Sequence, residues 1–399
     1  MTDRPDIDLV SGDFWGRNPH AEMTWMRQNQ PVYFDEKNGI WAITKYAHVK
    51  EASTNPKLFS SAGGIRPETG PIPMMIDMDD PAHVRRRKLV NRGFTPNRVK
   101  EQEAFLQHIS DELIDQVAER GECDFVWDVA AWLPLIVIGN ALGFAREGYP
   151  ELLKWSDAML SGLGQGDPSR LEEVTAAFTG YTTYIAGVIA DRRENPGDDM
   201  ISTLIHAEVD GDRLDDDSLI HESLLILIGG DETTRHVMTG GLYQLLSDRE
   251  QWERLRADRS LLNPAIEEML RWVSPIKNMA RTVTQDIDWH GASLKEGQKV
   301  LLLYPSANRD EDVFDDPFRF DMARTPNDHV AFGFGTHYCL GQALARLELR
   351  VLFDRLLDRL PDLRLVDESE PTHRPANFVS GYENMKVAFT PTTRIGATA

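Results

Sequence analysis

The sequence predicts a mainly α-helical protein with a minor β portion. Apolar residues recur at helical spacing through most of residues 81–275 and again over residues 340–360. Alternation typical of strands is confined to short stretches near residues 31–44, 279–303 and 386–390. A length of 399 residues alone would suggest two domains or more, but the sequence contains no internal repeat and no obvious domain boundary.

The first 80 residues predict a hairpin followed by a long loop. Residues 31–34 and 40–43 have the pattern of short strands, and Asn38-Gly39 supplies a turn between them. Residues 61–80 are rich in Gly, Pro and Met and predict a long loop, which is a type of segment that often carries function. At its end, Asp80-Pro81 predicts an N-cap followed by Pro at the first helical position.

Composition argues against two kinds of partner. The formal net charge of −21 argues against nucleic-acid binding, and 41% hydrophobic with 27% charged residues is typical of a soluble globular protein. Residues 1–10 are polar without an apolar run, so we expect no signal peptide and no membrane anchor. The two cysteines fit a reducing cytoplasm. Cys123 has no metal-site spacing to another Cys or His, so we interpret it as structural.

The segment most informative about function is residues 332–341, FGFGTHYCLG. Apolar residues at helical spacing follow Cys339, so we expect this cysteine at a helix N-terminus, where unpaired N–H groups and the macrodipole favour an anion. A thiolate, not a thiol, is the form that ligates a metal. Gly333, Gly335 and Gly341 carry no Cβ, so the backbone can approach a flat ligand closely. The alternative is a buried free cysteine beside an ordinary turn.

This segment resembles the haem-binding loop of the cytochrome P450 superfamily, in which a Cys thiolate holds the haem iron. The resemblance covers essentially the whole chain and implies that residues 1–399 form a single domain with the cytochrome P450 fold. It also implies haem b (iron protoporphyrin IX) as cofactor and Cys339 as the axial metal ligand. Phe332, Gly333, His337 and Gly341 are implied to lie against the haem.

A second motif lies in the proline-free stretch from His221 to Leu246, which predicts a long helix. Gly229 and Gly230 near its middle cost about 1 kcal/mol each relative to Ala, so a groove or local distortion is expected there. Glu232 and Thr233 follow, and the segment resembles the oxygen-activating part of P450 monooxygenases. The resemblance implies that Thr233 hydrogen-bonds dioxygen and that Glu232 helps to deliver protons. The alternative is a helix packing point with a solvated acidic patch.

Two further sets of residues match the family. Glu268 and Arg271 lie three apart on one helix face and resemble the Glu-x-x-Arg motif, which implies a structural ion pair. The two haem propionates need cationic or N–H partners when buried. The resemblance assigns that role to four residues: His83, Arg87, Arg281 and His337. Each of these is ambiguous alone, because a lone His or Arg is more often structural or at the surface.

A run of basic residues stands out on the acidic chain. Its members are Arg85, Arg86, Arg87, Lys88, Arg92, Arg98 and Lys100. In the enzymes that the chain resembles, this region borders the thiolate side of the haem, where a positive patch would attract an acidic ferredoxin. A solvated helix face is the equal alternative. No flavin or dinucleotide fingerprint and no iron–sulfur cysteine cluster is present, so we expect electrons to come from a separate ferredoxin and ferredoxin reductase.

The expected pocket wall is largely apolar and favours a large lipophilic substrate, although the same residues could be plain core. Its members are Ile72, Met74, Met75, Ile76, Ile226, Gly229, Gly230, Val273, Ile276, Met279, Phe378 and Val379. Residues 73–80, 224–236 and 374–381 resemble those of the mycobacterial steroid side-chain hydroxylases. This implies oxidation of the terminal side-chain methyl of cholesterol or cholest-4-en-3-one by dioxygen, first to the alcohol and then towards the acid.

Other functions stay open at this point. A P450 monooxygenase could act on another lipophilic substrate, such as a fatty acid or terpenoid. A peroxide-driven peroxygenase would not require the full proton relay, so Glu232 and Thr233 argue against it. A haem sensor or a sterol-binding protein would catalyse no reaction. No signalling domain is visible in the sequence, which argues against the sensor.

Overall fold

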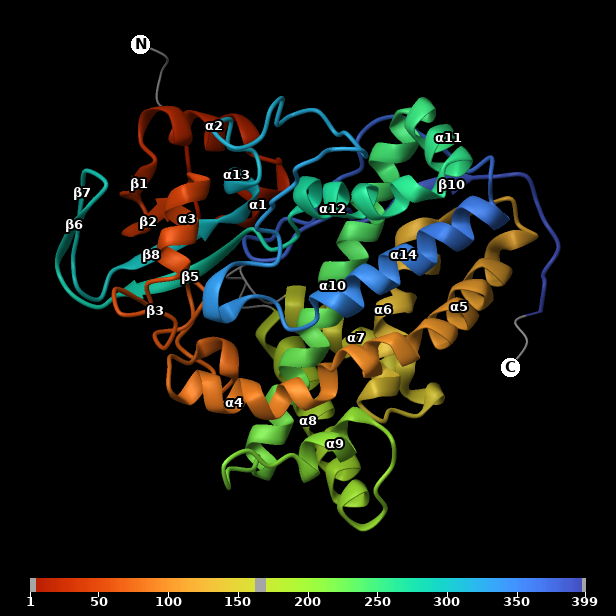
Figure 1. Ribbon diagram of the computed structural model, residues 1–399, viewed down its shortest axis with the longest axis horizontal. Helices are drawn as coiled ribbons and strands as arrows, with labels where there is room; N and C mark the ends of the chain where they lie inside the picture. Colours follow the sequence, from red (N-terminus) through yellow and green to blue (C-terminus); the bar gives the residue numbers. More distant parts are fainter. Residues whose placement is uncertain (1–4, 162–169, 397–399) are drawn as a thin grey trace.

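The secondary-structure elements gather in two regions in the computed structural model, which describes residues 5–161 and 170–396. In the view of Figure 1, a sheet and the short helices around it lie on the left, and the long helices lie on the right. Part of the predicted helical stretch, residues 162–169, and the first residues of the polar amino-terminal segment fall outside the described ranges.

The α-helices account for nearly half of the described residues. They are α1 Gly12–Gly16, α2 His20–Asn29, α3 Tyr46–Ser53, α4 Ala82–Val90, α5 Pro96–Ala118, α6 Trp132–Ala141, α7 Tyr149–Ser161, α8 Leu171–Glu194, α9 Met200–His206, α10 Asp216–Ser247, α11 Arg249–Ala257, α12 Leu262–Val273, α13 Tyr304–Ala307 and α14 Gln342–Arg359. The strands are β1 Val32–Asp35, β2 Ile40–Ile43, β3 Phe59–Ser60, β4 Glu122–Asp124, β5 Asn278–Val283, β6 Ile287–Trp289, β7 Ala292–Leu294, β8 Lys299–Leu303, β9 Arg364–Leu365 and β10 Lys386–Ala388. The mainly α fold with a minor β portion is therefore confirmed.

The larger sheet has the strand order β1-β2-β8-β5-β3. The predicted hairpin forms its edge, with Val32 opposite Ile43 and Asp35 opposite Ile40. Strand β2 pairs with β8 in parallel, whereas β5 pairs with β8 and β3 in antiparallel fashion. One end of β5 points towards the centre of the molecule, where it meets the helices (Figure 1).

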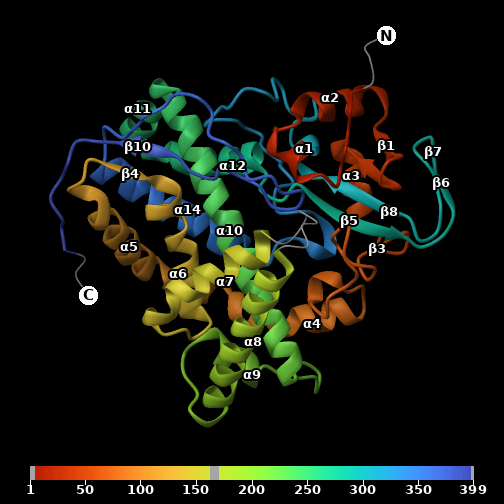
Figure 2. The same cartoon turned by 180° about the vertical axis from the view of Figure 1, so that it is seen from behind.

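Helix α10 runs through the middle of the helical region (Figures 1 and 2). Its N-cap Asp215 accepts a hydrogen bond from the backbone N–H of Ser218 at 2.9 Å. The negative charges of Asp216 and Asp217 in its first turn interact favourably with the positive N-terminal end of the helix dipole. It packs against α6, α8, α12 and α14, so most of its side chains are buried. A residue in its middle can therefore face an internal cavity.

Two local predictions are wrong. Helix α4 takes Pro81 itself as N-cap, without a side-chain hydrogen bond; the Asp80 carboxylate turns instead to His83 Nδ1, 3.3 Å away. Strand β4 interrupts the stretch predicted to be helical, because residues 122–124 pair with β10 and such long-range pairing overrides local pattern. Among the described residues, no helix is long and apolar enough to span a membrane. The cytoplasmic location stays a prediction.

Candidate functional site

A large cavity that opens to solvent lies between α10, α4, the loop that carries Cys339 and the start of β5. Its lining residues enclose about 1630 Å³, the solvent at its mouth included, and most of the lining is apolar, as is usual for small-molecule and cofactor sites. All eight residues predicted to bind the cofactor line it. They are His83, Arg87, Arg281, Phe332, Gly333, His337, Cys339 and Gly341.

The loop before α14 holds Cys339 at the cavity wall. The Cys339 backbone N–H donates to the Phe332 carbonyl at 2.9 Å, which closes the loop. Gly335 has a φ of +75°, and a Cβ there would lie 2.5 Å from the Ser53 carbonyl oxygen, so only glycine fits. Burial raises the pKa of the Cys339 thiol, whereas the N–H groups of Gly341 and Gln342 and the nearby positive charge of Arg87 act in the opposite direction. Donors for an anion therefore converge on the sulfur.

The four predicted propionate residues lie together and offer two arginine charges and two imidazole rings. The rings of His83 and His337 lie 4.1 Å apart, and burial together with the charges of Arg281, His83 and Arg87 lowers the pKa of His337 to about 3. Buried His83 Nε2 has no hydrogen-bond partner among the described residues. Within the same part of the chain, the buried Arg281 side chain donates only to the Ala280 carbonyl. Such a cluster is short of acceptors and suits buried carboxylates. With Cys339 on the same cavity, these residues fit a haem with its two propionates.

The α10 wall of the cavity carries Thr233 and the glycine pair. Thr233 lines the cavity, and its hydroxyl donates to the Gly229 carbonyl at 2.8 Å. Gly229 faces open space, so the absence of its side chain widens the cavity. A Cβ at Gly230 would lie 2.9 Å from Ile138, so this glycine permits close packing of α10 on α6. The helix continues through both glycines.

Glu232 does not line the cavity but sits in a buried ion cluster beside it. Its Oε1 lies 2.7 Å from Arg374 Nη1, 3.1 Å from Arg235 Nη2 and 3.2 Å from His236 Nε2. Burial raises the pKa of the carboxyl, but the hydrogen bond from His236 and the arginine charges outweigh burial and lower it to about 2. Glu232 is therefore ionised at neutral pH.

A second, polar cavity lies further along α10, where His236 and Gly240 line it. His236 borders it, and buried His236 Nδ1 has no hydrogen-bond partner among the described residues. Burial and the charge of Arg309 lower the pKa of Lys277, another lining residue, to about 7. Gly381 leaves room for the imidazole, because a Cβ there would lie 2.2 Å from His236 Nδ1. His236 thus connects this cavity to Glu232.

Nine of the twelve predicted substrate residues line the large cavity. They are Met75, Ile76, Ile226, Gly229, Gly230, Ile276, Met279, Phe378 and Val379. Met74 lies within the main hydrophobic core and Ile72 packs against it. Only one side of the 72–76 segment can face the cavity, so these two side chains point away from it. Val273 lies at the end of α12, where it contacts Gly240 and borders the polar cavity.

The cavity also contains residues that sequence reasoning missed. They are Ile65, Arg66, Phe94, Ile138, Leu160, Leu225, Ile228, Thr234, Val237, Leu270, Pro275, Tyr304, Ala331, Leu340, Leu344, Ala345, Glu348 and Leu349. Helical spacing from Thr233 could have found Val237, which lies one turn further along α10. Arg66 is an isolated residue of the long loop, and no sequence pattern singles it out.

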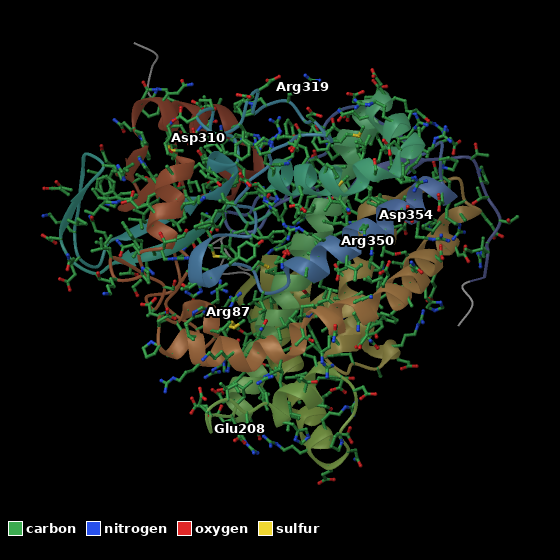
Figure 3. All side chains as sticks on the ribbon, in the orientation of Figure 1. Arg87, Glu208, Asp310, Arg319, Arg350 and Asp354 are labelled. Atoms are coloured by element: carbon green, nitrogen blue, oxygen red, sulfur yellow. The ribbon has the colours of Figure 1, made fainter. Side chains whose placement is uncertain are left out.

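A groove also reaches Cys339, and Lys100, Arg346 and Arg350 border it. Arg346 pairs with Glu267 at 2.6 Å and Arg350 with Glu103 at 2.9 Å. Figure 3 shows Arg87 on α4 and Arg350 on α14. Not all of the basic run is available here, because Arg86 pairs with Glu222 at 3.4 Å and Arg98 donates to the Asp198 carbonyl at 3.3 Å.

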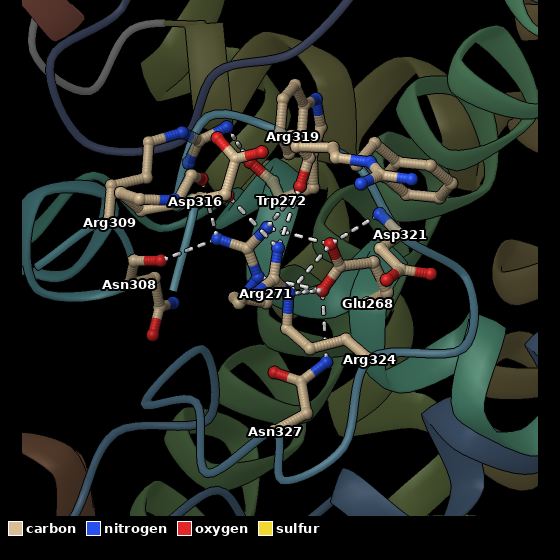
Figure 4. A network of polar contacts seen from close by, with 12 residues as sticks. Glu268, Arg271, Trp272, Asn308, Arg309, Asp316, Arg319, Asp321, Arg324 and Asn327 are labelled. Carbon is tan, nitrogen blue, oxygen red and sulfur yellow. Dashed lines mark hydrogen bonds and ion pairs between the residues drawn. The ribbon is translucent and has the colours of Figure 1, made fainter. Parts of the chain in front are cut away.

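Glu268 and Arg271 form the centre of a buried network (Figure 4). Two hydrogen bonds of 2.7 Å join the carboxylate to the guanidinium, and both side chains are fully buried. Arg271 Nη1 also donates to the Asn308 carbonyl at 2.8 Å, and Glu268 accepts from the backbone N–H of Asp321 at 2.9 Å. The pair thereby ties α12 to the segment that precedes the Cys339 loop.

Comparisons with known proteins agree with this geometry. The sequence model of a family described as cytochrome P450 matches residues 163–389. The chain is 54% identical over 399 residues to a steroid C26-monooxygenase of Mycobacterium tuberculosis, covering 99% of this chain and 100% of that protein. It is 53% identical to a steroid C26-monooxygenase of Mycolicibacterium smegmatis, with 99% of each covered. The crystal structure of CYP109E1 from Bacillus megaterium in complex with testosterone matches with a TM-score of 0.86 at 34% identity, covering 94% of this chain and 99% of that one.

Proposed function

The chain belongs to the cytochrome P450 family and is a P450 monooxygenase, and from this premise we propose that it hydroxylates the terminal side-chain methyl of cholesterol or cholest-4-en-3-one and oxidises the alcohol further. The identity to steroid C26-monooxygenases along the whole chain carries the proposal. The size and apolar walls of the large cavity support a substrate of this class.

Haem b would be held by Cys339 at the iron and by His83, Arg87, Arg281 and His337 at the propionates. When bound, it supplies the iron centre at which dioxygen is reduced and one oxygen atom is inserted into a C–H bond. Burial raises the pKa of the Cys339 thiol, and the N–H groups of Gly341 and Gln342 and the positive charge of Arg87 act against burial, so they would favour the anionic sulfur once haem is bound. The apolar walls exclude water from the reacting methyl.

Protons are the second requirement, because reduction of dioxygen consumes them at a site whose walls are largely apolar. In our proposal, the Thr233 hydroxyl hydrogen-bonds dioxygen and Glu232 passes protons to it. Neutral His236 can take a proton at Nδ1 from the polar cavity and give the proton on Nε2 to ionised Glu232, 3.2 Å away. Ion pairs with Arg374 and Arg235 hold the Glu232 carboxylate in place to receive that proton.

Electrons would come from an acidic ferredoxin, reduced by a ferredoxin reductase. The groove supports a docking site there, because it reaches Cys339 and Lys100 lies at its edge. Arg346 and Arg350 add positive charge that Glu267 and Glu103 offset in part. Positive charge at such a groove raises the rate of association with a negatively charged partner.

The decisive experiment is incubation of the haem-loaded enzyme with cholest-4-en-3-one, a surrogate ferredoxin and its reductase, followed by identification of the product. The proposal expects the side-chain alcohol and then the acid. Ring hydroxylation, or no shift of the ferric haem spectrum with the steroid, would contradict it. Turnover with hydrogen peroxide but none with the redox pair would favour the peroxygenase function instead.

A further inference from the structure

Arg66 is a buried cation on the wall of the large cavity. It has no part in the proposed binding of haem or transfer of protons. The residue is 3% exposed and lines the cavity. Its Nε and Nη1 are both buried without a hydrogen-bond partner among the described residues. Because an unpaired buried donor of a charged group is costly in free energy, these atoms point to an acceptor on a bound ligand.

The nearest carboxylate is already used by the backbone. Asp77 Oδ2 lies 3.7 Å from Arg66 Nη1, which is beyond hydrogen-bond distance. The two Asp77 oxygens accept from the backbone N–H groups of Ile65 at 2.9 Å and Ile72 at 2.8 Å. Asp77 therefore stabilises the loop that contains Ile65 and Ile72, and its charge offsets part of the Arg66 charge. Nε and Nη1 of Arg66 stay without a hydrogen-bond acceptor among the described residues.

The guanidinium is also held in position. Its central carbon lies 5.4 Å from the centre of the Phe378 ring, a cation–π distance. The wall around it is otherwise apolar, with Ile65, Phe378 and Val379 in one buried cluster and Ile276 and Met279 packed against it. A ligand atom that reaches this wall therefore meets one fixed, charged donor in apolar surroundings.

We infer that Arg66 is a binding subsite for a carbonyl oxygen on the ring end of a steroid. The inference rests on the proposed function, which puts the opposite, side-chain end at Thr233 and Cys339. Arginine only donates hydrogen bonds and a ketone oxygen only accepts them, so the two match. A carboxylate would bring a full negative charge close to Asp77.

The test compares three ligands that share a side chain and differ at the ring end: cholest-4-en-3-one, cholesterol and cholest-4-ene. Dissociation constants for the haem-loaded protein are measured by titration. Wild type is expected to bind the ketone about 10-fold or more tightly than cholest-4-ene, because hydrogen bonds to charged groups are worth about 1.5–3 kcal/mol. R66M is expected to bind the three ligands with similar affinity, and R66K to recover part of the preference.

Lys299 supplies a matched control. Its Nζ donates to the carbonyls of Gly63 and Gly64 in the same loop, but it does not line the cavity. K299M is therefore expected to weaken all three ligands alike and to keep the preference for the ketone. If R66M loses the preference only as much as K299M does, Arg66 acts through the loop and the inference is wrong.

Two other outcomes separate the possible failures. Loss of haem from R66M with the ketone preference intact would assign Arg66 to the cofactor and overturn the inference. If wild type binds ketone and cholest-4-ene equally and hydroxylates both side chains, the Arg66 subsite is wrong and the proposed function stands. If wild type oxidises neither side chain, the proposed function itself fails.

Discussion

His236 Nε2 lies 3.2 Å from Glu232 Oε1, one turn along α10, and both side chains are buried. His236 also borders the polar cavity, and its other ring nitrogen, Nδ1, is buried without a hydrogen-bond partner among the described residues. Burial lowers the pKa of His236 to about 4 against the raising effect of Glu232, so the imidazole is neutral at pH 7. A neutral imidazole between an ionised carboxylate and a polar cavity has the donor and the acceptor that a proton route requires.

The first prediction concerns this histidine. H236N keeps a polar side chain but removes the paired ring nitrogens, so kcat with dioxygen and a redox pair is expected to fall about 10-fold, less than the roughly 10²-fold effect of losing a direct proton donor. The solvent deuterium isotope effect on kcat should rise. The control is turnover driven by hydrogen peroxide, which brings its own protons and should be unchanged. A parallel loss of both activities would show that His236 only supports the fold.

Thr233 is expected to control how electrons are used. T233V removes the hydroxyl but keeps the shape, so dioxygen should still be consumed while the yield of hydroxylated product per electron pair falls about 10-fold or more. The ratio of product to reductant consumed measures this directly. T233S, which restores a hydroxyl, should recover most of the yield. Unchanged coupling in T233V would exclude Thr233 from dioxygen binding.

The sequence predicted the chemistry-bearing positions better than their surroundings. The resemblance to the P450 family assigned Cys339 to the iron and His83, Arg87, Arg281 and His337 to the propionates, and all of them line the large cavity. Arg66 was missed because its significance depends on Asp77 and Phe378, which only the fold brings near it. The polar cavity was missed for the same reason, since His236, Lys277 and Gly381 are far apart in the chain. Strand β4 was not predicted from the sequence, because its partner strand β10 lies more than 250 residues away along the chain.

The Glu268–Arg271 pair is expected to support the fold and not the chemistry. E268Q leaves the Arg271 charge buried without its partner, which costs about 3–5 kcal/mol of the free energy of unfolding. Denaturant titration of the haem-loaded protein measures this loss. The control is E253Q on α11, where an exposed carboxylate pairs with Arg249 and Arg256 and less than about 1 kcal/mol is expected. Equal effects of the two variants would contradict a buried structural pair.

The positive groove is expected to govern the encounter with a ferredoxin. Lys100 is exposed at its edge, so K100E should slow association with an acidic ferredoxin several-fold at low salt, and the difference should shrink at high salt because ions screen exposed charges within about 10 Å at 0.1 M. Stopped-flow reduction at varied ionic strength measures this. K295E, beside the β6–β7 hairpin, is the control with the same charge change. A similar effect of both variants would reflect net charge alone.

Glu222 predicts a pH dependence of stability. Its carboxylate is fully buried on α10. Oε1 accepts a hydrogen bond from the backbone N–H of Met75 at 2.8 Å, which ties the segment that contains Met75 and Ile76 to the helix. Burial raises the pKa of Glu222 to about 7, although Arg86 and the Met75 N–H act against it. Between pH 4.5 and about 7 the folded protein therefore holds a proton that the unfolded chain releases, so stability falls as pH rises through this window.

E222Q removes this titration while its carbonyl can still accept from Met75. At about 1.36 kcal/mol per pKa unit, the free energy of unfolding of wild type should decline by up to about 3 kcal/mol more than that of E222Q between pH 4.5 and pH 8. Asp231, whose pKa burial raises to about 6, contributes the same decline to both proteins and cancels in the comparison. Denaturant titrations of both proteins at several pH values test this, and parallel curves would show that Glu222 stays ionised throughout.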